Sequence, residues 1–191
     1  MGSKEHTLLI SPIGDLDGNG ELLDQLRKEI GEVFGYETEV RPLIEEKDLQ
    51  ADPIRKQVHS TPILETLALV GPPEAVKILA ITRVDLFIPV LTHVYGEAQL
   101  GGRACILSTF RFAERGSPDP ETFRCRMVKE AIHELGHTFN LRHCRDAGCV
   151  MHYCRSVSEV DRKSSQFCRY CAVLLQDAMN RMGKEPVISK Q

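Results

Sequence analysis

The segment from His133 to His143 constrains this chain more than any other, because it reads His-Glu-Leu-Gly-His-Thr-Phe-Asn-Leu-Arg-His. His133 and His137 are four residues apart, so on a helix their side chains leave one face about one turn apart. Two imidazoles at that spacing can bind one Zn²⁺. His143 lies six residues beyond His137, so the chain has to turn after the helix to bring it back.

Three histidine ligands leave the fourth position on zinc open for water, which is typical of a catalytic rather than a structural site. Glu134 follows the first histidine and can reach that water without binding the metal itself. A His-Glu-x-x-His segment alone also arises by chance in helices. The third histidine at this offset favours a functional site over chance.

Cysteines follow this segment in two close pairs, which are Cys144, Cys149, Cys168 and Cys171. Four cysteines so grouped have the composition of a tetrahedral Cys₄ zinc site. The alternative interpretation is a set of unconnected core thiols. The remaining cysteines, which we expect to be buried thiols, are Cys105, Cys125 and Cys154.

Length and charge exclude several classes of protein. The chain has 191 residues and a net charge of −3, which fits one domain and argues against a nucleic-acid-binding surface. No apolar run approaches the ~18 residues that span a bilayer. Residues 8–10 are too short for a secretory segment, and Pro12 follows them. Seven cysteines without a secretion signal predict a reducing, cytoplasmic location without a membrane.

Strands and helices are expected to alternate along the first half of the chain. Apolar and turn residues predict strands over residues 8–10, 36–44, 76–88 and 105–112. The same signals predict a turn at 17–20 and helices over 22–34, over 63–70, from 119–120 onwards and from near Ser164 to Gly183. This alternation predicts a mixed α/β sheet.

The long helix that opens at Asp119 and Pro120 should carry the first two histidines. Asp119 is a suitable N-cap, and proline fits the first helical position. Apolar residues four apart form its core stripe, which is Phe123, Met127, Ala131, Leu135 and Phe139. His133 and His137 lie off this stripe, so we expect them to face a cleft.

The histidine segment, with a methionine at Met151 and the four cysteines after it, resembles the metzincin metallopeptidases. Within that clan, Cys144 directly after the third histidine and the later cysteine pair resemble the archaemetzincins, which carry a second, structural zinc. The resemblance is specific over residues 133–171. It is softer upstream, where residues 84–86, 95–98 and the strand from Arg103 look like the family's central and edge strands.

The resemblance implies an α/β (α+β) fold with a mixed twisted sheet, an active-site helix and a small C-terminal lobe clamped by zinc. It implies a single catalytic domain over residues 1–191, with an upper lobe at about 1–139 and a lower lobe at about 140–191. It also implies two Zn²⁺ ions per chain. His133, His137 and His143 would bind the catalytic ion, and the four cysteines would bind the structural ion.

The resemblance further implies that the chain hydrolyses peptide bonds. Glu134 would act as the general base that assists attack by the zinc-bound water, and Met151 would form an apolar floor beneath the imidazoles in the Met-turn. One residue departs from the family, which has glycine at Asn140. Asparagine is the next most tolerant residue in the left-handed region, so we expect the bend there to survive.

Tyr153 lies two residues after Met151, where the astacin-like and serralysin-like metzincins carry a tyrosine that reaches the catalytic zinc. Two interpretations stay open: the phenol stabilises the transition state, or the side chain packs at the boundary of the lobes.

Three functions compete at this stage. The first is a zinc peptidase whose edge strand, near residues 103–112, pairs with an extended peptide or protein substrate. The second is a zinc hydrolase of a non-peptide substrate. The third is a binding module with metals in structural roles, against which Glu134 argues because a structural site has no use for it. We expect the protein to act as a monomer.

Overall fold

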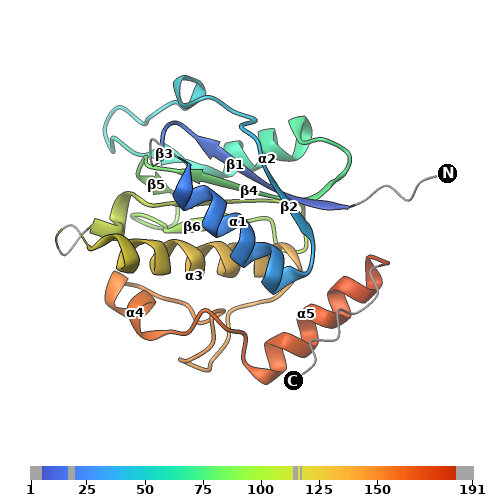
Figure 1. The fold of residues 1–191 in the computed structure, drawn as a ribbon. Coiled ribbons are helices and arrows are strands. Elements are labelled where there is room, and N and C mark those ends of the chain that lie inside the picture. The colour runs from blue at the N-terminus through green and yellow to red at the C-terminus, as the bar shows by residue number, and fades with distance from the viewer. Residues whose placement is uncertain (1–5, 17–19, 114–115, 117, 184–191) are drawn as a thin grey trace.

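A five-stranded sheet forms the centre of the computed structural model, which describes residues 6–16, 20–113, 116 and 118–183 (Figure 1). The strand order is β2-β1-β4-β7-β6, in which the first four strands run parallel and β6 runs antiparallel to β7. The strands are β1 Thr7–Ile13, β2 Glu37–Val40, β4 Ala75–Thr82, β6 Gly96–Ala98 and β7 Ala104–Ser108. A second, two-stranded sheet pairs β3 (Val58–His59) with β5 (Leu86–Phe87).

Helices cover both faces of the main sheet, so the predicted mixed α/β architecture is confirmed. The helices are α1 Glu21–Phe34, α2 Ser60–Val70, α3 Pro120–Thr138, α4 Val157–Arg162 and α5 Arg169–Arg181, with short 3₁₀ helices η1 Glu46–Asp48 and η2 Phe110–Ala113. Side chains alternate along β1, because successive residues of a strand point to opposite faces. Leu8 and Ile10 therefore join the core under α1 and α3, whereas Leu9 joins the core under α2.

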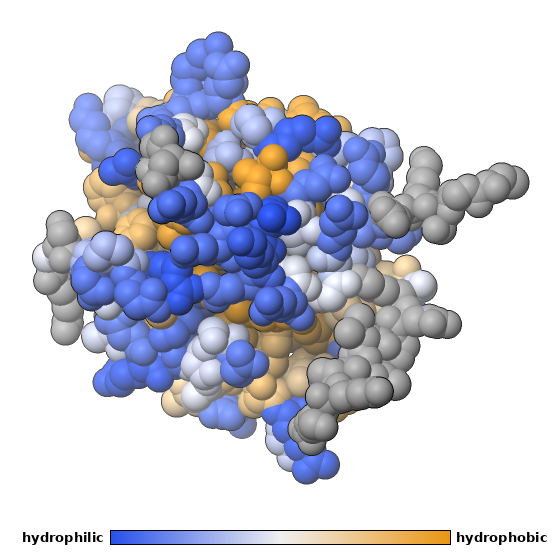
Figure 2. Space-filling model, viewed as in Figure 1, coloured by the Kyte–Doolittle hydropathy of each residue, from blue (hydrophilic) through white to orange (hydrophobic). Residues whose placement is uncertain are grey.

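Helix α1 shows how this packing follows from sequence. Its buried side chains are Leu26, Ile30 and Phe34, which recur at helical spacing and face the core. Hydrophilic side chains cover its outer face, as the centre of Figure 2 shows. Gly35 ends the helix in a left-handed conformation, with φ 62°.

Helix α3 begins and packs as the sequence predicts. The Asp119 side chain accepts a hydrogen bond from the backbone N–H of Thr122, and Pro120 is the first helical residue. The helix lies beneath the sheet, and α4 lies on its other side (Figure 1). Because it is covered on both sides, almost every residue from Arg126 to Thr138 is buried.

Several predicted bounds are wrong. The strand expected over 76–88 ends at Thr82, where the chain bends and then joins the second sheet as β5. The strand expected over 36–44 ends at Val40. The last helix begins at Arg169 rather than near Ser164, and α4 was not predicted. Most of the turn predicted at 17–20 lies outside the described residues.

The predicted edge strand is also wrong. Strand β7 pairs with β4 on one side and with β6 on the other, so it is an internal strand. The chain makes a tight hairpin after β6, in which Gly101 adopts a positive φ of 68° and Gly102 N–H bonds to the Gln99 carbonyl. The strand at this edge of the sheet is therefore β6, and β2 is at the other edge. None of the helices in the described part of the chain combines the length and apolar character needed to cross a membrane.

Candidate active site and second metal centre

The three histidines of the predicted catalytic site converge. His133 and His137 come from α3, and His143 comes from the loop that follows it. One candidate ligand atom from each lies within 4.8 Å of the others. The Nε2 atoms of His133 and His137 are 3.1 Å apart.

Backbone carbonyls orient two of the imidazoles. His133 Nδ1 lies 2.8 Å from the Val150 carbonyl oxygen, and His137 Nδ1 lies 2.6 Å from that of Leu141. A carbonyl oxygen can only accept, so each Nδ1 donates and each Nε2 is left with a lone pair for a metal.

The environment also keeps these side chains neutral, which is the state that binds zinc. Burial lowers the pKa of His133 well below its usual value and lowers that of His137. Burial, with nearby His137, lowers the pKa of His143 to about 4. The orientation of the imidazoles and their neutral state therefore both fit the binding of a zinc ion.

Asn140 makes the bend that returns His143 to the site. It adopts the left-handed conformation with φ 68°, so the expectation that the bend survives without glycine is confirmed. The Leu141 N–H bonds back to the Gly136 carbonyl, which closes the end of the helix. The hairpin after β6 also contacts this end, because Gly101 N–H donates to the His137 carbonyl.

The Glu134 carboxylate lies between the histidine-bearing face of α3 and the edge strand. Glu134 is only 5% exposed. A Cβ atom placed on Gly96 of β6 would lie 2.6 Å from Glu134 Oε1, so the missing side chain at Gly96 makes room for the carboxylate. Burial raises the pKa of Glu134 well above its usual value. The nearby carboxylates of Glu130 and Glu97 raise it further, and the Lys163 ammonium lowers it. Such a group is suited to accept and return a proton.

The three histidines and Glu134 line one cleft of about 680 Å³. Strand β6 and the chain before it line this cleft, and so do residues Tyr153–Arg155. The candidate metal ligands His133, His137 and His143 all line it, as does Glu134. The cleft therefore gives a substrate access to both the metal position and the carboxylate.

Met151 and Tyr153 flank the histidines. Met151 is fully buried, and a Cβ atom on Gly136 would lie 2.5 Å from its sulfur, so the thioether packs directly against α3 beside His137. Tyr153 is 43% exposed and lines the cleft, with its ring centroid 5.0 Å from that of His143.

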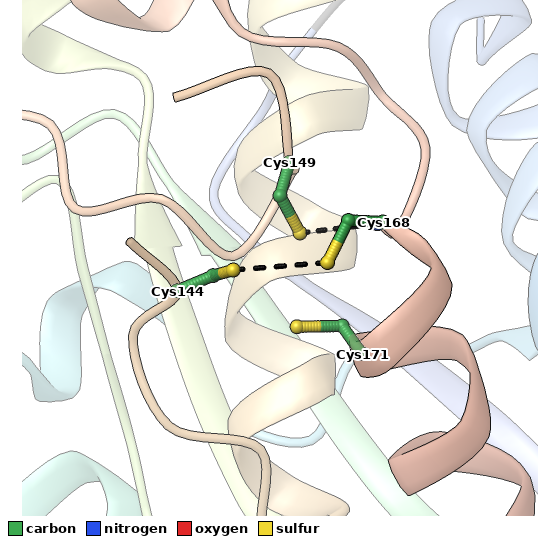
Figure 3. A group of neighbouring side chains, drawn as sticks. All are labelled: Cys144, Cys149, Cys168 and Cys171. Atoms are coloured by element: carbon green, nitrogen blue, oxygen red, sulfur yellow. Dashed lines mark hydrogen bonds between the residues drawn. The ribbon is translucent and has the colours of Figure 1, made fainter. Parts of the chain in front are cut away.

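The four predicted cysteines converge, and their sulfur atoms point toward one another (Figure 3). All four lie within 4.8 Å of one another, and the sulfurs of Cys144 and Cys168 are 3.7 Å apart. Four thiolates at 2.3 Å from one tetrahedral zinc are about 3.8 Å apart, so the geometry fits that ion. Burial raises the pKa of Cys149 and Cys171, whereas the Cys171 backbone N–H lowers that of Cys168.

The two candidate metal centres share one segment of chain. Cys144 N–H donates to the Met151 carbonyl, and His152 Nδ1 donates to the Cys144 carbonyl at 3.0 Å. His143 directly precedes Cys144, so whatever fixes the cysteine also fixes the third histidine.

The sequence analysis missed a buried ion pair in this cleft, formed by Glu130 and Lys163. Glu130 lies four residues before Glu134 on α3, and that spacing could have identified it. Lys163 is far from Glu130 in the sequence, and no motif or spacing marks it as part of this site. Of the three remaining cysteines, Cys105 and Cys154 are buried as predicted, whereas Cys125 is only half-buried.

Comparison with known proteins agrees with this architecture. The model of Peptidase family M54 matches residues 73–177. The chain is 44% identical to the archaemetzincin of Methanopyrus kandleri over 68% of this chain and 72% of that protein. It is 37% identical to the archaemetzincin of Methanocaldococcus jannaschii over 89% of this chain and 93% of that protein.

A solved structure extends the comparison to the fold. The crystal structure of the Methanopyrus kandleri archaemetzincin matches with a TM-score of 0.80 and 35% sequence identity, over 93% of this chain and 97% of that chain. The family model, the relatives and the fold all agree with a peptidase of the metzincin type. The chain therefore belongs to peptidase family M54, the archaemetzincins, and is a zinc metallopeptidase.

Proposed function

We propose that the protein hydrolyses peptide bonds by water attack assisted by Glu134, at a Zn²⁺ ion held by His133, His137 and His143. The observation that carries this proposal is the position of the Glu134 carboxylate, which lies in one cleft with three neutral, converging imidazoles. The zinc would supply Lewis acidity, which polarises a carbonyl and lowers the pKa of water.

The residues of the chain supply the remaining steps. Strand β6 is one of the two edge strands of the sheet and lines the cleft, so an extended peptide can pair with it and place its carbonyl near the histidines. Glu134 accepts a proton from the attacking water and donates it to the leaving amine. Burial favours this exchange, because it raises the pKa of the carboxyl and makes it a better base.

Tyr153 and Met151 have supporting roles in this proposal. The Tyr153 phenol donates a hydrogen bond to the oxyanion that develops on the attacked carbonyl, and its place in the cleft beside His143 supports this role. Met151 forms the floor under the imidazoles, which its packing against Gly136 supports.

The proposal includes a second, structural Zn²⁺ held by the thiolates of Cys144, Cys149, Cys168 and Cys171. Their mutual distances support it, because they are close to those of a tetrahedral Cys₄ site. The division into two lobes near residue 139, the monomeric state and the cytoplasmic location stay predictions from the sequence.

Glu134→Gln tests the proposed mechanism. General-base catalysis is worth about 10²–10⁴ in rate, so hydrolysis of a fluorogenic peptide library should fall by that factor. Zinc content should stay unchanged, because glutamine keeps the shape of the side chain and Glu134 is not a proposed ligand. Glu121→Gln, at the exposed start of the same helix, is the matched control and should keep full activity.

Two outcomes would contradict the proposal. If Glu134→Gln loses its zinc, Glu134 is a ligand and not a base. If the wild-type protein cleaves no peptide in the library but hydrolyses a non-peptide ester or amide that a chelator protects, the substrate class is wrong.

A further inference from the structure

The cleft contains a buried ion pair that the proposed mechanism does not use. Lys163, which follows α4, places its ammonium nitrogen 2.7 Å from Glu130 Oε1 on α3. Lys163 is 2% exposed and Glu130 is 4% exposed, yet both line the cleft. Lys163 Nζ is also 3.4 Å from His133 Nδ1, so the pair lies directly beside a proposed zinc ligand.

The pair has unused hydrogen-bonding capacity. A lysine ammonium has three donors, and the contact of Lys163 with Glu130 Oε1 is an ion pair that leaves this oxygen without a hydrogen bond. His133 Nδ1 cannot accept from one of these donors, because its own proton points to the Val150 carbonyl. Within the part of the chain that the structure describes, Glu130 Oε1 is buried without a hydrogen-bond partner, and the contacts of Lys163 Nζ are those with Glu130 and His133. Buried polar groups usually find partners, so this capacity points to a partner from outside the chain.

The charges and hydrogen-bonding groups of the pair determine which substrate side chain can bind beside it. The two charges already neutralise each other, so a charged substrate side chain would bring an uncompensated charge into a buried position. An apolar side chain would leave the free donors and the carboxylate oxygen without partners, and buried polar groups without partners are unfavourable. A primary amide avoids both costs, because its carbonyl accepts from an ammonium and its NH₂ group donates to a carboxylate.

We propose that the Glu130–Lys163 pair binds the primary amide of a glutamine or asparagine side chain, on a substrate residue next to the scissile bond. The inference rests on the proposed peptidase function. It deepens that function by making an amide side chain the preferred substrate class. Proximity to His133 is what restricts the amide to a residue beside the bond that is cleaved.

A peptide panel tests this preference on the full, zinc-loaded chain. One set of peptides carries Gln, Glu or Met at the varied position, and a second set carries Asn, Asp or Leu. In each set the varied position lies directly before or directly after the scissile bond. We expect the amide to raise kcat/KM about tenfold or more over both its acidic and its apolar counterparts at one position. Each tenfold step corresponds to about 1.4 kcal/mol, which is the scale of one hydrogen bond. A wild-type preference for the apolar or acidic side chain at both positions would overturn the inference and leave the peptidase proposal intact.

The variant Glu130→Met/Lys163→Met converts the floor of this part of the cleft to an apolar surface of similar volume. Replacement of a buried ion pair by apolar residues is often neutral for stability. The preference should therefore reverse toward Met or Leu. Glu121→Met/Arg124→Met removes another ion pair of α3, which is more exposed, and should leave the preference unchanged. If the Glu130/Lys163 variant keeps the amide preference, another group reads the side chain and the inference is wrong.

A binding measurement separates this inference from catalysis. Two peptide hydroxamates, one with a glutamine side chain and one with a methionine side chain, need only the zinc ion to bind. Calorimetry should show about tenfold tighter binding of the glutamine compound to the wild-type protein, and equal affinities would overturn the inference. If the hydroxamates discriminate but no peptide is cleaved, the peptidase mechanism fails and the recognition site stands. If the double variant does not fold, the wild-type preference alone decides between these outcomes.

Discussion

The two regions of the molecule that meet at the end of α3 are stabilised in different ways. The sheet region, residues 7–138, covers both faces of its strands with helices and buries most of the apolar side chains of the protein. The C-terminal region, residues 139–183, contains two helices and long loops. Its last helix leaves Tyr170, Val173 and Leu174 exposed.

This difference explains the distribution of candidate metal ligands. His133 and His137 need no metal for their position, because α3 is held between the sheet and α4. The four cysteines join the loop after α3 to the start of α5 (Figure 3), a helix whose buried residues are Cys171, Leu175 and Met179. We infer that the sheet region presents a preorganised site, whereas the C-terminal region depends on metal for its structure.

Loss of one thiolate should produce the largest difference between the two regions. Cys168→Ser or Cys171→Ser removes a proposed ligand of a site that can contribute about 10–16 kcal/mol of folding-linked binding energy. Amide hydrogen exchange should lose protection across the C-terminal region and keep it in β1, β4 and β7. Zinc content should fall from two ions per chain, and affinity at the histidine site should weaken because His143 adjoins Cys144.

Cys125→Ser is the matched control, since Cys125 is a half-buried cysteine on α3 outside the cluster. Normal exchange protection and normal zinc content in both cluster variants would show that the cysteines do not share a metal.

Removal of the Tyr153 hydroxyl should have the next largest effect, and Tyr153 lies in the cleft that residues of both regions line. Tyr153→Phe should lower kcat by about 10²–10³ with little change in KM, because an oxyanion donor acts in the transition state. Tyr170→Phe, on the exposed face of α5, is the control. An unchanged kcat would leave packing beside His143 as the role of this tyrosine.

Features encoded by neighbouring residues could be predicted from the sequence. The Asp119 cap, the core stripe of α3 and the left-handed bend at Asn140 depend on the residues at or beside them. The convergence of four cysteines could also be predicted, because thiolates in two close pairs have one common explanation in a reducing environment. The family resemblance added the expected position of Met151.

Features set by distant partners could not be predicted. Strand β7 is internal only because β6 folds back on it, and no pattern within residues 103–112 distinguishes an internal strand from an edge. Lys163 meets Glu130 through the packing of α4 on α3. Charged residues normally stay exposed, so the spacing of Glu130 to Glu134 could mark Glu130, but nothing in the sequence pairs it with Lys163.

Substitution of Lys77 on β4 tests how the sheet region contacts the end of α3. Its ammonium donates to the carbonyls of Gly102 and Thr138, both at 2.7 Å, and burial lowers its pKa from 10.5 to about 8. Between pH 8 and 10.5 the unfolded chain binds more protons at this site than the folded chain, so the contribution of Lys77 to the stability of the wild-type protein rises with pH. Lys77→Met lacks this contribution.

The free-energy difference between wild-type protein and Lys77→Met should therefore shift toward the wild type across that window. The full pKa difference sets an upper limit of about 3 kcal/mol, and the two carbonyl hydrogen bonds reduce it because they favour the charged form. Denaturant titrations of both proteins at several pH values measure the shift. A difference that does not change with pH would mean that Lys77 keeps its ordinary pKa.

Substitution of Asn140 should have the smallest effect on stability, and this residue lies at the junction of the sheet region and the C-terminal region. Its φ of 68° strains most residues, and glycine tolerates this conformation without cost. Asn140→Gly should stabilise the protein by at most about 1 kcal/mol, since asparagine already tolerates the left-handed region and glycine adds entropy to the unfolded chain. Asn140→Ala should destabilise it by about 1 kcal/mol.

The contrast between these two variants isolates the backbone, because each of them removes the asparagine side chain. If the bend alone positions His143, zinc affinity at the histidine site should follow stability, with glycine equal to or better than asparagine and alanine weaker. If both variants lose affinity equally, the contact of the Asn140 side chain with the hairpin at Gly101 positions His143 instead. The sheet region would then control the third zinc ligand through that hairpin, and the dependence of the C-terminal region on its own metal would be smaller than we infer.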